Sequence, residues 1–307
     1  MNLPDSASRL IDVPGVRVGH YTDTRARTGV TAVIFGKSST ASVHVAGGAP
    51  GSQETDLLDP SCVAGGVDAI VLTGGSAFGL STTGGVRKYL EERGRGFCVG
   101  PHRVPIVPAA VIFDLSEGEP ARPGPDEGYK ACVDSEKPSR DEGFTGAGTG
   151  ATVGKYMGIE NRARGGLASR SVMAEDGVSI GALMVVNSYG AVVDSSTGRI
   201  IAGPKNANGE FVSYFDAPPI QPGFGSTAIG VVVTDCLLTK ADAKRVAVMA
   251  HDGLARSVIP CHTPYDGDMI FVVSTGNKRM ETARLGAWAA RLVEACVVGA
   301  VTGAGRG

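Results

Sequence analysis

The chain lacks the features that mark several large classes of protein. Its 307 residues carry a formal charge of −2, so no basic excess predicts binding to nucleic acid or to an acidic membrane surface. The opening segment, MNLPDSASRLIDVPGV, has no apolar core like that of a secretory signal. No run of eighteen or more apolar residues is present, because the closest segment contains Arg291 and Glu294. We therefore expect a cytoplasmic protein with no nucleic-acid or membrane partner.

Cysteine and histidine are too scattered to predict a disulfide framework or a metal site. None of the six cysteines forms a CxxC pair, and most have apolar neighbours, which favours buried free thiols. The five histidines show no spacing typical of metal ligands. We interpret His102 and His262, the two nearest the motifs described below, as packed or surface side chains. The sequence predicts neither a metal nor a cofactor.

Glycine is abundant, with 45 residues, which indicates many tight turns and close backbone approaches. Apolar runs of strand length alternate with turn residues, and longer segments have helical spacing, which predicts an α+β or layered α/β domain. Residues 118–128 are predicted as a loop, with a domain linker as the alternative, and 204–226 as a long loop, which in a compact domain is usually functional or mobile. Strands are expected at 16–21, 31–35, 41–47, 68–75, 106–115, on both sides of NSYG (187–190), at 227–235 and after Gly267, and helices at 76–96, 239–258 and 280–300.

The Gly-rich segment at 146–156, GAGTGATVGKY, is similar to a phosphate-binding loop but fails its pattern. Gly150 is one residue too close to the Gly-Lys pair for a Walker motif, and Tyr156 replaces the hydroxyl residue that binds magnesium. The GxGxxG pattern also fails, because Ala151 stands where its last glycine belongs. We interpret the segment as a turn that lets backbones approach closely, with Lys155 at its end.

Two other segments place polar side chains beside apolar runs. In PYDGDM, Asp266 and Asp268 point to the same face of an extended chain. Such a pair can bind a metal, share a proton or orient an amine, although Asp-Gly-Asp is also common in a plain turn, which the residues alone favour. Asn187, in VVNSYG, is either a hairpin residue with positive φ or an oxyanion donor at a strand end. The sequence contains no GxSxG elbow, which disfavours an ordinary α/β-hydrolase.

Six segments occur in a suggestive order: LTGGSAFGL (72–80), VPIVPAAVIFDL (104–115), GAGTGATVGK (146–155), MVVNSYG (184–190), STAIGVVVTDCLLTK (226–240) and HTPYDGDMIF (262–271). Together they resemble the L-aminopeptidase/D-esterase family, peptidase family S58, which includes the nylon-oligomer hydrolase. The similarity runs from about residue 10 to the C-terminus. It implies an N-terminal-nucleophile hydrolase with an αββα sandwich, no metal, and an assembly of identical protomers, a tetramer.

The resemblance also implies a site of self-cleavage. The family's nucleophile opens the strand that ends in Thr-Asp, and counting back from Thr234 reaches Thr227. Cleavage of the Ser226–Thr227 bond would divide one catalytic domain, 1–307, into fragments 1–226 and 227–307. Relatives often have Asn or Gly before the cut, so Ser226 is a departure, and cleavage of Gly225–Ser226 is the alternative.

Other roles carry over by position. The family's catalytic Lys falls on Lys155, its Asn on Asn187, and its acidic pair on Asp266 and Asp268. Some relatives have a functional Tyr within AVIYD, where this chain has Phe113, so a substrate contact there would lack the phenol.

The implied reaction is amide hydrolysis through an acyl-enzyme. The α-amine of a cleaved Thr227, with an ordinary pKa of about 7.7–8.0, would act as the base near neutrality. Asn187 would donate to the oxyanion, and Asp266 and Asp268 would hold Lys155 and the amine. Short peptides, amino-acid amides or amide oligomers are the expected substrates. The alternatives are an acyltransferase of the ornithine-acetyltransferase type and a non-catalytic relative, which would remain uncut.

Overall fold

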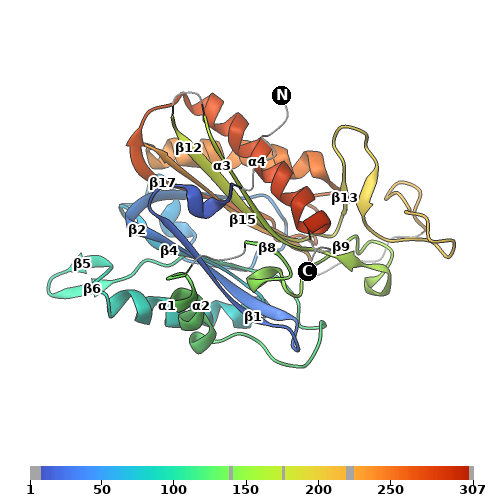
Figure 1. Cartoon of the computed structure of the whole chain (residues 1–307), viewed down its shortest axis with the longest axis horizontal. Helices are drawn as coiled ribbons and strands as arrows, with labels where there is room; N and C mark the ends of the chain where they lie inside the picture. The colour runs from blue at the N-terminus through green and yellow to red at the C-terminus, as the bar shows by residue number, and fades with distance from the viewer. Residues whose placement is uncertain (1–7, 138–140, 175–176, 219–224, 304–307) are drawn as a thin grey trace.

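The computed structural model describes residues 8–137, 141–174, 177–218 and 225–303. In these ranges a 10-stranded mixed sheet has the order β3-β7-β4-β2-β17-β15-β12-β11-β8, with β1 paired to β2 (Figure 1). Its strands are β1 (Val16–Asp23), β2 (Thr28–Val45), β3 (Ser52–Gln53), β4 (Val67–Thr73), β7 (Ala109–Val111), β8 (Glu142–Gly143), β11 (Gly166–Met173), β12 (Ser179–Asn187), β15 (Thr227–Cys236) and β17 (Met269–Lys278).

Smaller strand groups and four α-helices complete the described structure. The small pairings are β5 (Phe97–Val99) with β6 (His102–Val104), β9 (Thr152–Val153) with β10 (Ala163–Arg164), and β13 (Ala191–Val193) with β14 (Ile200–Ala202) and β16 (Val258–Ile259). The α-helices are α1 (Thr82–Glu91), α2 (Pro125–Asp134), α3 (Lys240–Ser257) and α4 (Thr282–Thr302).

Strand β2 connects the two halves of the sheet. Its first part pairs with β1 and β4, its last part pairs with β17, and its register against β4 shifts between Ile34 and Ser39. The prediction of two separate strands, 31–35 and 41–47, was wrong. Residues 36–38 have the composition of a turn, but they are an exposed stretch within one continuous strand.

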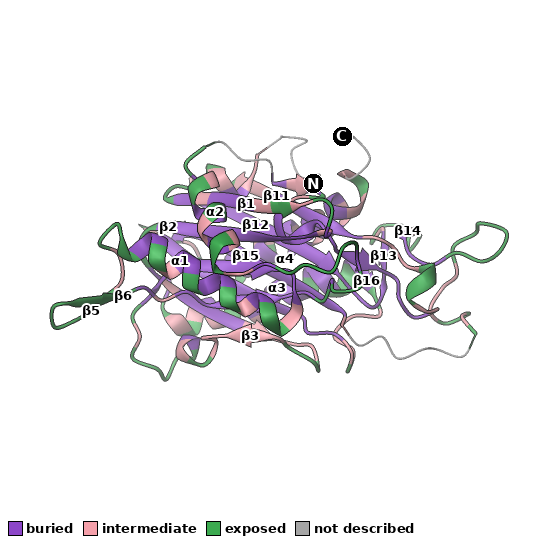
Figure 2. Cartoon of the chain, turned by 90° about the horizontal axis from the view of Figure 1, so that it is seen from below, coloured by how far each residue is buried: buried purple, intermediate pink, exposed green. Residues whose placement is uncertain are grey.

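Three buried clusters define four layers. The cluster between the halves of the sheet includes Phe35, Ile70 and Val231, while a second cluster joins β12, β15 and β17 to α3 and α4. A third cluster packs α1 and α2 on the outer face of β2, β4 and β7. Within β15, Val231 faces the other half of the sheet and Val232 faces the helices, as strand alternation requires. The predicted α+β fold with an αββα sandwich is confirmed, and buried strands fill its centre (Figure 2).

Helices α3 and α4 were predicted to within a few residues because each combines an apolar face with a clear N-terminus. The Thr239 side chain accepts from the Asp242 backbone N–H at the start of α3, which is a capping box. Helix α4, which contains the segment that comes closest to a membrane span in the sequence, is long and apolar enough to cross a membrane by length and composition, with a mean hydropathy of 1.4 over an 18-residue window. However, 56% of that window is buried, and the helix packs on α3, β11 and β12 as a core helix.

Helix α2 was not predicted. Its first residues, Pro125 to Gly128, lie in the segment predicted as a loop, because PGPDEG has turn composition. The helix starts there because Pro125 fixes the first-turn φ and the Glu127 carboxylate accepts from the Gly124 backbone N–H at 3.0 Å. Apolar residues then pack α2 against α1 and β1.

Candidate active site

Three strand ends meet around Thr227, the first residue of β15. Antiparallel pairing with β12 places Asn187, the last residue of that strand, directly opposite Thr227. On the other side β17 runs parallel to β15, and Ser226 forms a bridge with Asp266 just before β17 begins. The sheet therefore brings together residues that are far apart in the sequence, as the resemblance implied.

The Ser226–Thr227 peptide is buried and its carbonyl accepts two hydrogen bonds. Thr227 Oγ1 donates to Ser226 O at 2.5 Å, and the Gly267 backbone N–H donates to the same oxygen at 2.9 Å. A Cβ added at Gly267 would lie 2.9 Å from Thr227 Oγ1, so glycine leaves room for the hydroxyl. Our sequence reasoning missed Gly267, whose only signal is its place between two acidic residues.

Lys155 is directed into the site by the turn that precedes it. Gly154 has a φ of +71°, and the Lys155 backbone N–H donates to Tyr189 O at 2.8 Å, which ties the turn to the chain after β12. The Lys155 ammonium donates to Asn187 O at 2.8 Å and to Asn187 Oδ1 at 2.9 Å. Burial lowers the pKa of Lys155 to about 7, although the charge of Asp266 opposes this shift. The amine is therefore available in both protonation states near neutrality.

The side-chain amide of Asn187 has a fixed orientation. Its Oδ1 accepts from Lys155 and, at 3.0 Å, from the Thr152 backbone N–H. Its Nδ2 donates to Gly225 O at 3.1 Å and to Phe113 O at 3.3 Å. The hairpin interpretation with positive φ was wrong, because Asn187 ends a regular strand and is not among the described residues with positive φ. The amide N–H groups point at the segment that precedes Thr227.

Asp266 closes a turn and also faces the site. Its Oδ2 accepts from the Thr263 hydroxyl at 2.5 Å and from the Thr263 N–H at 3.2 Å, so the turn interpretation was correct in part. Its Oδ1 accepts from the Tyr189 N–H at 3.0 Å. Burial, together with the nearby charge of Asp268, raises the pKa of Asp266. Its charge acts on Lys155 through space, as the opposing effect on the Lys155 pKa shows.

Asp268 holds the peptide bond that follows Thr227. Its Oδ1 accepts from the Ala228 backbone N–H at 2.7 Å. Its Oδ2 accepts from the His262 backbone N–H at 3.0 Å and from His262 Nδ1 at 2.8 Å. His262 therefore does more than pack or lie on the surface, and sequence reasoning missed its partner. His102 is exposed in the β5–β6 hairpin, as expected.

Phe113 lies beside the same segment as Asn187. The residue is 40% exposed, and a Cβ added at Gly225 would lie 2.8 Å from Phe113 Cγ. Phe113 therefore lies against the residue two places before Thr227. Within the described ranges, no group of three or more His, Cys, Asp and Glu side chains is placed to hold a metal ion.

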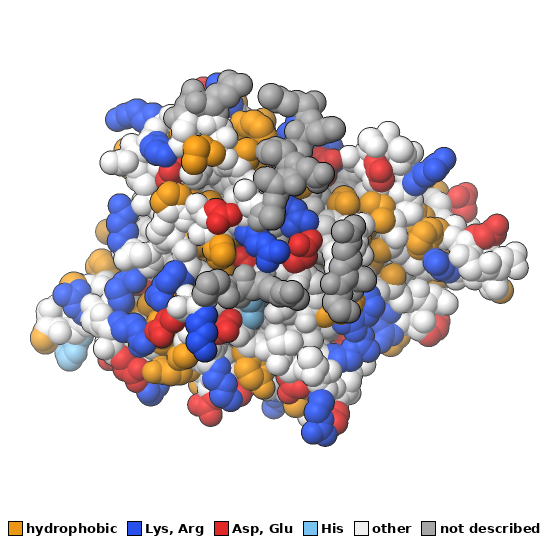
Figure 3. Space-filling model, viewed as in Figure 1, with side chains coloured by type: hydrophobic (Ala, Val, Ile, Leu, Met, Phe, Trp, Pro, Cys, Tyr) orange, Lys and Arg blue, Asp and Glu red, His pale blue; other side chains and the backbone are white. Residues whose placement is uncertain are grey.

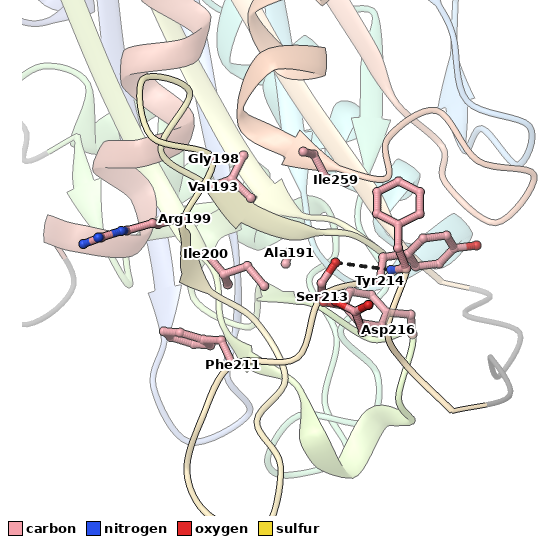
Figure 4. A pocket seen from close by; sticks show the side chains of 12 residues that line it. Ala191, Val193, Gly198, Arg199, Ile200, Phe211, Ser213, Tyr214, Asp216 and Ile259 are labelled. Carbon is pink, nitrogen blue, oxygen red and sulfur yellow. Dashed lines mark hydrogen bonds between the residues drawn. The ribbon is translucent and has the colours of Figure 1, made fainter.

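A separate cavity of about 600 Å³ lies among β13, β14, β16 and the loop at 211–216 (Figure 4). Apolar and aromatic side chains dominate its lining, with Arg199 and Asp216 as the charged members. Tyr156, which follows Lys155, lines the cavity and packs against Tyr189 with ring centroids 6.2 Å apart. No candidate catalytic residue lines this cavity in the described structure, so Thr227 does not face into it.

Charge on the surface is mixed in sign. On the face shown in Figure 3, Lys and Arg side chains are interspersed with Asp and Glu. This distribution agrees with the formal charge of −2.

The layered fold has solved counterparts. A solved structure of the L-aminopeptidase D-Ala-esterase/amidase from Ochrobactrum anthropi, described as a variant of the Ntn hydrolase fold, superposes with a TM-score of 0.72. The match covers 98% of this chain and 87% of that chain at 19% sequence identity. The architecture is thus that of the N-terminal-nucleophile hydrolases.

Sequence relatives define the family. An uncharacterized aminopeptidase of Mycobacterium leprae is 40% identical over 292 residues, covering 87% of this chain and 78% of the relative. A 6-aminohexanoate-oligomer endohydrolase of Kocuria sp. is 29% identical over 305 residues, covering 94% of this chain and 81% of the relative. The model of peptidase family S58 matches residues 8–306. The chain belongs to peptidase family S58.

Proposed function

We propose that this protein is an amidohydrolase that cuts its own Ser226–Thr227 bond and then uses Thr227 as an N-terminal nucleophile. One observation carries the proposal. The Thr227 hydroxyl donates to the carbonyl oxygen of the Ser226–Thr227 peptide bond, which also accepts from the Gly267 N–H. The names of the relatives favour amino-terminal residues of short peptides, or amide oligomers, as substrates.

Self-cleavage begins with an N-to-O acyl shift. Thr227 Oγ1 attacks the carbonyl carbon of Ser226, and neutral Lys155 takes up the hydroxyl proton and returns it to the leaving nitrogen. The C–N bond of the peptide breaks as the ester forms, and the Gly267 N–H stabilises the oxyanion of the tetrahedral intermediate between peptide and ester. Water then hydrolyses the ester, which leaves a Ser226 carboxylate and a free α-amine on Thr227.

The cleaved protein has a base that the intact chain lacks. The α-amine of Thr227 takes the proton from its own Oγ1, which attacks the carbonyl carbon of the substrate amide. The C–N bond breaks as the α-ammonium returns the proton to the leaving amine, and water then hydrolyses the acyl-enzyme to release the acid. Departure of the segment that ends at Ser226 frees one Asn187 Nδ2 hydrogen from Gly225 O and the Gly267 N–H from Ser226 O, while Phe113 O still accepts from Nδ2. We assign the substrate oxyanion chiefly to Asn187, because its amide is already held by Thr152 and Lys155.

One contact favours the alternative cut. Gly225 O accepts from Asn187 Nδ2 at 3.1 Å and from Lys155 Nζ at 3.5 Å, so the Gly225–Ser226 carbonyl is also polarised. We prefer the later bond because β15 begins at Thr227 and because Gly267 donates to Ser226 O. N-terminal sequencing of the smaller fragment separates the two, since a first residue of Ser identifies the earlier cut.

We also propose a cytoplasmic homo-oligomer, a tetramer, on the basis of the family resemblance. Light scattering coupled to size-exclusion chromatography measures the mass of the purified protein directly. A monomer at micromolar concentration would contradict the assembly and leave the chemistry of the site unaffected.

Substitution of the nucleophile tests the proposal. Thr227→Ala should give a folded chain of full length that neither cuts itself nor hydrolyses amides, whereas Thr227→Ser should retain both reactions at reduced rates because a hydroxyl remains. A denaturing gel and an assay with amino-acid p-nitroanilides measure the two reactions. Amide hydrolysis by purified Thr227→Ala would show that the nucleophile lies elsewhere.

A further inference from the structure

Two histidine rings, those of His262 and His251, continue from Asp268 as a hydrogen-bonded row. His262 Nδ1 is 2.8 Å from Asp268 Oδ2, and His262 Nε2 is 3.3 Å from His251 Nδ1 in helix α3. His251 Nε2 is 3.1 Å from the backbone carbonyl oxygen of His44 in β2. The row therefore connects the site to the helix layer through hydrogen bonds.

The hydrogen-bonding capacity of these groups fixes where the protons lie. A backbone carbonyl only accepts, so His251 Nε2 carries a proton. Burial of the His251 ring keeps it neutral, so its Nδ1 accepts and His262 Nε2 donates to it. Asp268 accepts from the backbone N–H groups of Ala228 and His262, and its Oδ2 lies 2.8 Å from His262 Nδ1, an arrangement suited to a carboxylate. His262 consequently donates from both ring nitrogens and is an imidazolium.

We propose that His262 is a positioning residue that remains doubly protonated at neutral pH and holds the Asp268 carboxylate, which in turn fixes the Ala228 amide beside the nucleophile. This role in catalysis rests on the proposed function of Thr227, whereas the protonation state does not. His262 is bonded to one carboxylate oxygen through both its ring and its backbone, and Ala228 to the other. Asp268 is thereby held by His262 and Ala228, whereas the charge of Asp266 acts on Lys155 through space.

The backbone at His262 is held in a costly conformation that serves this geometry. His262 has a φ of +54°, in the left-handed region that non-glycine residues rarely occupy. This conformation lets the backbone N–H and ring Nδ1 of one residue reach the same oxygen, Asp268 Oδ2. Strain of this kind persists where surrounding contacts require it, and it is often found at functional sites.

The charged and titratable neighbours agree with an imidazolium at His262. Burial alone would lower the pKa of His262, but hydrogen bonds to Asp268 and Cys261 raise it to about 10. Burial and the charge of His262 lower the pKa of His251 to about 4, so His251 stays neutral. Beyond His251 lies His44, and burial together with the charge of Lys244 lowers the pKa of its ring. One ring in the row, His262, thus carries the charge.

Nitrogen-15 NMR of the histidine rings tests the protonation state. We expect the Thr227→Ala chain, labelled at histidine, to show both His262 nitrogens protonated from about pH 6 to about pH 9, and His251 protonated at Nε2 alone. The exposed His102 ring is the internal reference for a histidine outside the row. A His262 ring that loses a proton in step with His102 would overturn the proposal.

Paired variants test the positioning role. His262→Asn keeps a donor and tolerates positive φ but removes the positive charge beside the Asp268 carboxylate. We expect self-cleavage and kcat to fall tenfold or more at pH 7, KM to change little, and the acid limb of the kcat profile to move to higher pH. His251→Phe, which removes the acceptor for Nε2–H, should make the His262 ring lose its second proton at lower pH.

The matched control is His102→Asn, which should change none of these quantities. A His262→Asn variant with wild-type rates and an unchanged acid limb would refute the positioning role. Wild-type protein that never cuts itself would contradict the proposed function instead, and the NMR result would still decide the charge on His262.

Discussion

Replacement of Asn187 separates the two reactions that the site is proposed to perform. In the intact chain the Asn187 Nδ2 group donates to Gly225 O and Phe113 O, whereas Ser226 O accepts from the Gly267 N–H. Self-cleavage therefore has its own donor, and turnover of substrate depends on Asn187. Asn187→Ala should slow hydrolysis much more than it slows self-cleavage.

The magnitude follows from what the side chain touches. Loss of a single oxyanion donor typically lowers kcat by about 10²–10³, or about 2.7–4 kcal/mol. Loss of Oδ1 also leaves the buried Thr152 N–H without its acceptor and removes one acceptor of Lys155. Each such loss costs about 1–3 kcal/mol in free energy of unfolding. The alanine variant should thus be both slow and less stable.

Asn187→Asp is the matched control for stability. It keeps oxygen acceptors for Thr152 and Lys155 but lacks the amide donor, so hydrolysis should fall while most of the stability remains. Single-turnover hydrolysis, the time course of self-cleavage on a gel, and urea unfolding measure the three quantities. If Asn187→Ala hydrolysed substrate at the wild-type rate, or lost both reactions equally, the division of roles between Asn187 and Gly267 would be wrong.

Two further predictions concern Lys155 and Gly267. Because the pKa of Lys155 is lowered to about 7 in the folded protein, the unfolded chain binds more protons above that pH, so stability should rise with pH from about 7 toward the ordinary lysine value. Lys155→Met should lose this pH dependence of stability in urea unfolding and should stop self-cleavage. Lys155→Arg should also stop self-cleavage because arginine stays protonated. Rapid self-cleavage by either variant would exclude Lys155 as the base. Gly267→Ala places a Cβ 2.9 Å from Thr227 Oγ1 and 2.7 Å from Ala49 O, so it should slow self-cleavage. The control, Gly84→Ala in helix α1, should not slow it. Equal rates of self-cleavage in the two variants would show that the Thr227 hydroxyl has room to move.

The sequence predicted the parts of the fold whose signals are local. Strand β15 and helices α3 and α4 combine apolar periodicity with clear ends, and all three were located. The continuity of β2 through residues 36–38 depends on pairing with β4 and β17, which sequence composition does not encode. Helix α2 was missed because Pro125 serves equally well in a turn and at a helix start.

The residues of the site likewise divide into those that the sequence predicted and those that it did not. Thr227, Lys155 and Asn187 were selected by resemblance to a family, and the structure places them around one peptide bond. Gly267 contributes a backbone N–H, which leaves no trace in side-chain chemistry. The role of His262 depends on its hydrogen bonds to His251 and Asp268, which are near in the sequence but whose contacts follow only from the three-dimensional arrangement. Whether these residues perform the assigned chemistry stays a prediction.

The mass of the purified wild-type protein tests the central claim most directly. After prolonged incubation, denaturing mass spectrometry should show two species, 1–226 and 227–307, with Thr227 as the first residue of the smaller one. Thr227→Ala, treated in the same way, should remain a single species of full length. An intact wild-type chain of full length that hydrolyses amides would contradict the account.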